Sequence, residues 1–127
     1  MRDFPDSGLP IYTQIMAAVK RDIACGGWPP GSRVPPVREL AVRFGVNPNT
    51  AQRALTELER ENLLYSERTS GRFVTRDASA IAAAKESMAR ELVGDFLGGM
   101  KSLGYTPAEI KAFLAAIANE TGGGDKQ

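Results

Sequence analysis

The chain has 127 residues, of which 43% are apolar and 24% charged, and its formal net charge at pH 7 is +1. This composition is typical of a soluble globular protein with one ordinary domain or two small modules, and the apolar runs are too short for a membrane span. The chain has no histidine, which excludes His-based catalytic triads and His-ligated zinc. It also has no phosphate-binding loop, so we expect neither an enzyme nor a cofactor or metal site.

The N-terminal residues and the single cysteine suggest where the protein resides. MRDFPDSGLP has neither a basic n-region nor an apolar h-region, so we expect no signal peptide or anchor. Cys25 cannot form an internal disulfide and has no metal-ligand companion nearby, which fits a reducing compartment. We therefore expect a cytoplasmic protein, with Cys25 as a small buried thiol near a helix end.

The charges are unevenly distributed along the chain. Residues 1 to 76 contain 11 Lys/Arg and 8 acids, whereas residues 77 to 127 contain 5 and 7. Ten of the eleven basic residues in the first part are arginines, which suit forked contacts with phosphates and guanine edges. The first part is therefore the candidate for binding nucleic acid.

Two helices are predicted first. Apolar residues spaced by four, from Ile11 to Ile23, indicate an amphipathic helix over about 10 to 25, which Gly26-Gly27 ends. Trp28 is expected to cover the core, and Arg33-Val34 to add a short strand. A second helix over about 36 to 44 has Pro36 in its first turn and Gly45 as a left-handed C-cap.

A third helix begins after a very short turn. Asn47 is a good N-cap and Pro48 suits the first helical position. At about 100° per residue, one side of this helix is polar and the opposite side is apolar. The polar side contains Asn49, Gln52, Arg53, Thr56 and Arg60, and the apolar side contains Ala51, Ala54, Leu55 and Leu58.

Residues 63 to 67 and 72 to 75 are then predicted to form two strands joined through 68 to 71. Such a hairpin is a wing, whose small arginine-flanked tip can approach a sugar-phosphate backbone or the minor groove. An ordinary solvent-exposed hairpin is the alternative. The wing residues proposed to contact DNA are Arg68, Thr69, Ser70, Gly71 and Arg72.

These segments together resemble the DNA-binding domain of the GntR family of bacterial transcription regulators. The resemblance covers about half of the chain and is carried by PPGSRVPPVREL, FGVNPNT, ALTELERENL and SGRFV. It implies that DNA contacts come from the R-E-L arginine, the start of the recognition helix and the wing glycine. The residues at these positions are Arg38, Asn47, Asn49, Thr50, Gln52, Arg53 and Gly71.

Individual residues keep simpler alternatives. Arg38 could pair with Glu39 or another acid, and Asn47 could act only as a cap. The chain also departs from the family at two positions. Pro36 stands where many relatives have Ser, which weakens the cap of the second helix, and Pro48 replaces a second arginine that could contact a base.

The C-terminal part is predicted to form two helices, the first from about 78 to 100 and the second after a Thr106–Glu109 capping box. Two helices of this size cannot cover their apolar faces alone, so we expect them to pack against the same pair of a second subunit. A small-molecule pocket is the alternative use of the Met and aromatic positions. The expected dimer residues are Ile81, Met88, Leu92, Phe96, Met100, Ile110, Phe113, Leu114 and Ile117.

The expected architecture is mainly α: a winged helix-turn-helix over 1–76, a two-helix dimerisation domain over 77–121 and a disordered tail over 122–127. It resembles the YtrA-like subfamily of GntR regulators, whose members are commonly linked to transporter operons. The resemblance implies a homodimeric regulator, a repressor in our interpretation, that binds a pseudo-palindromic double-stranded DNA operator, with any small-molecule effector unknown. A winged protein-interaction module that no longer binds DNA is the alternative.

Overall fold

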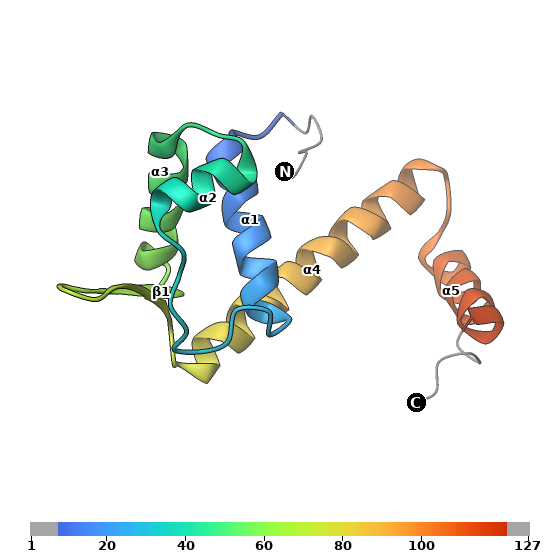
Figure 1. Cartoon of the computed structure of the whole chain (residues 1–127). Helices are drawn as coiled ribbons and strands as arrows, with labels where there is room; N and C mark the ends of the chain where they lie inside the picture. Colours follow the sequence, from blue (N-terminus) through green and yellow to red (C-terminus); the bar gives the residue numbers. More distant parts are fainter. Residues whose placement is uncertain (1–7, 122–127) are drawn as a thin grey trace. The chain divides into compact units, whose positions relative to one another are not determined.

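The computed structural model describes residues 8–121, which form five helices and one two-stranded antiparallel sheet (Figure 1). The elements are α1 (Ile11–Ala24), α2 (Val37–Phe44), α3 (Pro48–Arg60), β1 (Leu64–Glu67), β2 (Gly71–Val74), α4 (Ala78–Ser102) and α5 (Pro107–Thr121). The mainly α winged helix-turn-helix with a C-terminal helical segment is therefore confirmed. The chain divides into two compact units, Met1–Glu86 and Ser87–Gln127.

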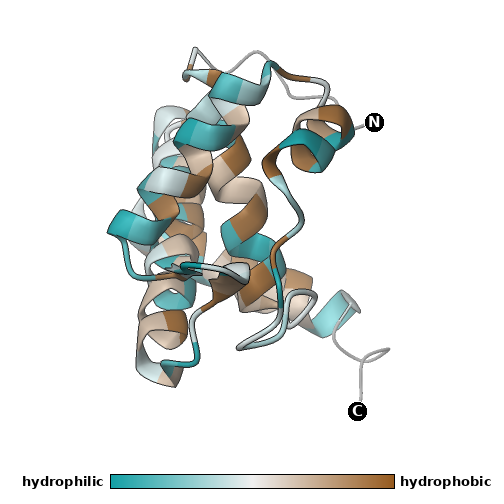
Figure 2. Cartoon of the chain, turned by 60° about the vertical axis from the view of Figure 1, so that its left-hand side comes forward, coloured by the Kyte–Doolittle hydropathy of each residue, from teal (hydrophilic) through white to brown (hydrophobic). Residues whose placement is uncertain are grey.

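The core of the first unit lies between α1, α2, α3 and the hairpin. The spacing of four in α1 turns Ile15, Val19 and Ile23 to one side, and all three are buried. They meet Leu40 of α2 and the buried stripe of α3. Figure 2 shows this division, with brown apolar segments on the inward sides of the helices and teal segments outside. Burial of these side chains supplies most of the driving force for folding.

The turn between α2 and α3 is formed as expected from the sequence. Gly45 ends α2 in the left-handed conformation, with φ of 68°. The Asn47 side chain then accepts a 2.7 Å hydrogen bond from the backbone N–H of Asn49, and Pro48 occupies the first turn of α3. This turn fixes the direction in which α3 leaves the core.

The wing is a regular hairpin in which Leu64 pairs with Val74 and Glu67 with Gly71. Its tip projects away from the helices in Figure 1. The predicted Arg33-Val34 strand forms an isolated bridge to β2, where Val34 N–H donates to Arg72 O at 2.8 Å. The wing is therefore anchored at its base on both strands: β2 is hydrogen-bonded to residues 32–34, and β1 follows α3 after three residues.

The first turns of α4 belong to the winged unit. Asp77 caps the helix by accepting from the Ser79 and Ala80 backbone N–H groups. Ile81 and Ala84 then pack against the core of the first unit. The compact unit consequently extends to Glu86, whereas the sequence interpretation divided the chain at residue 76. The apolar spacing alone did not reveal that these turns share the winged domain's core.

The second unit contains the rest of α4 and α5. The Thr106–Glu109 capping box is confirmed, since each residue's side chain accepts a hydrogen bond from the other's backbone N–H. Met100 and Ile110 are buried, but most of the unit's other large apolar side chains are exposed. The predicted tail over 122–127 lies outside the described residues.

The exposure of Cys25 differs from the buried position expected from the sequence. Cys25 follows α1 as the C-cap residue, and its side chain is exposed rather than buried. The reason is its position one residue beyond the last helical turn, just before Gly26-Gly27, where the chain leaves the core.

Candidate nucleic-acid interface

Helix α3 presents a polar face to solvent. Its buried stripe is Ala51, Ala54, Leu55 and Leu58, as the sequence predicted. On the other side Asn49, Gln52 and Arg53 are exposed, while Thr50 is half-buried. One side of α3 thus packs in the core, and the opposite side is exposed and could enter a DNA groove.

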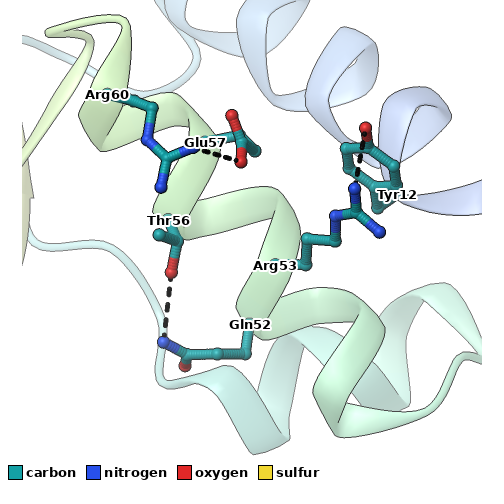
Figure 3. Close-up of polar contacts among 6 residues, drawn as sticks. All are labelled: Tyr12, Gln52, Arg53, Thr56, Glu57 and Arg60. Atoms are coloured by element: carbon teal, nitrogen blue, oxygen red, sulfur yellow. Dashed lines mark hydrogen bonds and ion pairs between the residues drawn. The ribbon is translucent and has the colours of Figure 1, made fainter.

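Two contacts on this face orient its longer side chains (Figure 3). Gln52 Nε2 donates to Thr56 Oγ1 at 3.3 Å, one turn along the same helix. The Arg53 guanidinium lies 4.0 Å from the ring centroid of Tyr12 and donates to its hydroxyl at 3.4 Å. Tyr12 comes from α1, so the position of Arg53 depends on a residue that sequence reasoning did not include in the site. A cation held over an aromatic ring is the interaction expected of this pair.

Arg38 is exposed on α2 and forms no ion pair with any other described residue. The acid proposed as its alternative partner, Glu39, instead binds Arg43 at 2.8 Å. Among residues 8–121 no carboxylate pairs with Arg38. Its guanidinium is therefore available to a phosphate or a base edge.

The caps of the two helices differ. Asn47 uses its side-chain oxygen to cap α3, and this hydrogen bond accounts for the residue whether or not it also contacts DNA. Pro36 precedes α2 and provides no side-chain cap, in agreement with the weaker cap expected from the sequence. Glu39 in the first turn of α2 compensates in part through the helix dipole.

The wing separates its residues into two groups. Arg68, Thr69, Ser70 and Gly71 are exposed at the tip. Arg72, which the sequence also predicts to contact DNA, is half-buried, and its Nε donates to Glu59 Oε2 at 2.6 Å. Arg72 therefore anchors the wing to α3.

Glu59, which lies on α3, bonds to both strands of the wing. The same carboxylate oxygen also accepts a hydrogen bond from Ser66 Oγ of β1. Partial burial raises the pKa of Glu59, but the hydrogen bonds from Ser66 and Arg72 and the charge of Arg72 outweigh it, so the net pKa is lowered. Glu59 is thus charged at neutral pH and holds both strands.

No helix within residues 8–121 is long and apolar enough to cross a membrane. In the same residues no three potential His, Cys, Asp or Glu ligands lie together as they would around a metal ion. The polar face of α3, Arg38 and the wing tip thus form the candidate site.

A short turn between two helices, an exposed polar recognition helix and an adjoining arginine-bearing wing define a DNA-binding transcription regulator of the winged helix-turn-helix class. The family described as "Bacterial regulatory proteins, gntR family" matches residues 11–74. The chain belongs to the GntR family.

Two bacterial relatives match nearly the whole chain. The uncharacterized HTH-type transcriptional regulator YhcF of Bacillus subtilis is 36% identical over 118 residues, covering 93% of this chain and 95% of YhcF. The HTH-type transcriptional repressor YtrA of the same organism is 31% identical over 123 residues, covering 96% and 95%. These matches extend through the C-terminal helices and support the YtrA-like subfamily. The family and these relatives are transcription regulators.

Solved structures of bacterial transcription regulators share the fold of this chain. A GntR family transcriptional regulator from Listeria monocytogenes has a TM-score of 0.79 and 35% identity, covering 89% of this chain and 98% of that chain. The DNA-binding domain of AraR in complex with operator ORX1 has a TM-score of 0.52 and 32% identity, covering 59% and 93%. The second match concerns the winged part.

Proposed function

We propose that the protein represses transcription as a homodimer that places two copies of α3 in adjacent major grooves of a pseudo-palindromic operator. The observation that carries this proposal is the exposed polar face of α3, together with Arg38 on the preceding helix, which pairs with no acid among residues 8–121, and the wing that follows α3. The relative YtrA is named a repressor, and the AraR domain is solved on an operator. Both support the proposal.

Each part of the surface has its own role. Arg38 reads a guanine edge or a phosphate with its forked donors, and the first turns of α3 reach base edges. The wing tip contacts the sugar-phosphate backbone, which adds affinity without sequence information. The proposed contacts are Arg38, Asn47, Asn49, Thr50, Gln52, Arg53, Arg68, Thr69, Ser70 and Gly71.

The second unit supports the proposed dimer. Leu92 is 70% exposed and Leu114 is 47% exposed, as are other large apolar residues of α4 and α5. A monomer rarely leaves so many apolar side chains in water, and a second copy of the same helices is the economical cover. We omit Ile81 from the proposed interface, because it packs against the core of the winged unit. The proposed interface is Met88, Leu92, Phe96, Met100, Ile110, Phe113, Leu114 and Ile117, of which Met100 and Ile110 also pack within the unit.

The regulated genes are proposed from the subfamily. Because YtrA-like regulators are commonly linked to transporter operons, we place the operator upstream of such an operon. No effector is assigned.

The decisive experiment selects bound fragments from the source genome and measures the mass of the protein alone and on the selected site. We expect enrichment of sites with two inverted half-sites and a protein mass of two chains. Absence of any enriched DNA would overturn the proposed sequence-specific DNA binding and favour the alternative, a protein-interaction module. A single chain on one half-site would overturn the dimer.

A further inference from the structure

An arginine from outside the hairpin lies against the wing. Arg33 precedes α2 and pairs with Phe73 of β2 through an isolated antiparallel bridge. A Cβ built on Gly71 would lie 3.3 Å from Arg33 Nη2 and 3.4 Å from its Nε. The guanidinium of Arg33 thus extends along the wing to the point where β2 begins.

Gly71 provides the space for this arrangement. Its φ is 110°, a conformation that side chains rarely adopt, and the added carbon would be closer to the guanidinium than ordinary van der Waals contact allows. Any other residue here would displace Arg33 or strain the turn. The glycine therefore keeps the wing close to the arginine as well as permitting the turn.

The other arginines near the wing base are engaged. Arg72 binds Glu59, and Arg76 donates to the Tyr65 hydroxyl at 3.4 Å while its guanidinium covers Gly31. Arg33 is exposed, and no carboxylate within residues 8–121 pairs with it. Its positive charge is therefore not neutralised by any acid in the described part of the chain.

The backbone that carries Arg33 is fixed before any partner binds. Val34 N–H donates to Arg72 O at 2.8 Å, and Val74 N–H donates to Ser32 O at 2.9 Å. These bonds hold residues 32–34 against β2 on both sides of Arg33. Little backbone entropy is consequently lost when its side chain engages an anion.

We propose that Arg33 is a phosphate-binding residue of the wing, positioned across Gly71, and that it flanks the tip together with Arg68. This inference rests on the proposed DNA-binding function and adds a contact to it. A guanidinium is suited to this role because its fork matches two phosphate oxygens. The contact adds affinity to any sequence, because the phosphate backbone is the same along the duplex.

The test compares Arg33→Gln, Arg33→Lys and a control, Arg21→Gln, in the full-length protein. Gln keeps a polar side chain that reaches as far as the Arg33 Nε position and removes the charge, whereas Lys keeps the charge. Arg21→Gln removes the same charge from the exposed end of α1. Binding to the selected operator and to unrelated duplex DNA is measured over a range of salt concentrations, and circular dichroism with thermal melting checks the fold.

For Arg33→Gln we expect the slope of log affinity against log salt to fall in magnitude by about 0.9 for each subunit, or about 1.8 for the proposed dimer, on both DNAs alike. Arg33→Lys should retain the slope, and Arg21→Gln should leave it unchanged. A folded Arg33→Gln variant with the wild-type slope would overturn the inference, as would a loss confined to the operator. Wild-type protein that binds neither DNA would instead overturn the proposed function itself, so the two failures are distinguishable.

Discussion

Glu59 Oε2 accepts a 2.6 Å hydrogen bond from Arg72 Nε, which links the recognition helix α3 to the second strand of the wing. Ser66 donates to the same oxygen from the first strand. One carboxylate therefore ties both strands of the wing to α3. Glu59 thereby links α3 and the wing, both of which are proposed to contact DNA, although Glu59 itself is not in the proposed DNA surface.

This network predicts a dependence of stability on pH. The pKa of Glu59 is lowered in the folded protein, so its contribution is fully present above its ordinary pKa of 4.5 and is lost as pH falls through the lowered value. We expect Glu59→Gln to be less stable than wild type at neutral pH, with the difference shrinking in acid. Urea unfolding of both proteins from about pH 7 to about pH 3 measures this difference. A constant difference across that range would show that the charge of Glu59 is not involved.

Arg38→Ala should weaken binding to the operator by about 1–3 kcal/mol, because an unpaired forked donor set is lost. The measurement is a titration at fixed salt on the operator and on unrelated DNA. Arg43→Ala is the matched control, since Arg43 lies on the same helix but is already paired with Glu39. Equal affinities for Arg38→Ala and wild type would remove Arg38 from the site.

Arg68→Ala tests the wing tip. If Arg68 binds phosphate, the variant should weaken binding to all sequences and reduce the salt slope by roughly one unit for each subunit of the proposed dimer. The variant combining Arg68→Ala with Arg33→Gln should reduce the slope by roughly two units for each subunit, since the two residues would neutralise different phosphates. A slope unchanged by Arg68→Ala would leave this part of the wing as a solvent-exposed hairpin.

Asn47 has one established role and one proposed role, which substitution can separate. Asn47→Ala should destabilise the protein by about 0.5–2 kcal/mol through loss of the α3 cap, whereas Asn47→Asp retains an accepting oxygen and should stay close to wild type. Denaturant unfolding measures this effect. If Asn47 also contacts DNA, Asn47→Asp should weaken operator binding despite its stability, because it brings a negative charge toward phosphate. Wild-type affinity of Asn47→Asp would leave the cap as the residue's whole function.

The apolar face of the second unit predicts the oligomeric state. Leu114→Glu should shift the protein from twice the chain mass to one chain mass in light scattering, because a buried charge without a partner is costly. Val42→Glu is the control, since Val42 is also an exposed apolar residue but lies on α2. A dimer that survives Leu114→Glu would place the interface elsewhere.

Local signals in the sequence were enough to place the helices and the turn. Gly45, Asn47 and Pro48 act through their own backbone or that of the next residues, so their effect is visible in the order of amino acids. The Thr106–Glu109 capping box is local in the same way. The polar and apolar stripes of α3 also follow directly from helical geometry.

Pairings between distant segments were not predictable in this way. Arg72 and Glu59 lie 13 residues apart, and Arg53 and Tyr12 lie 41 apart. Nothing in a single sequence says which exposed arginine will find an acid or an aromatic ring once the chain folds. The same limit applied to Ile81, whose helical spacing matched the C-terminal stripe but whose position lies against the first core.

The exposed thiol of Cys25 offers a way to measure the geometry of the proposed dimer. It is the chain's single cysteine, so a maleimide-linked spin label or dye would attach at one defined position at the end of α1. A dimer would then carry two identical probes, one on each winged unit. The distance between the two probes, measured with and without operator, reports how far apart the two winged units of the dimer lie in solution.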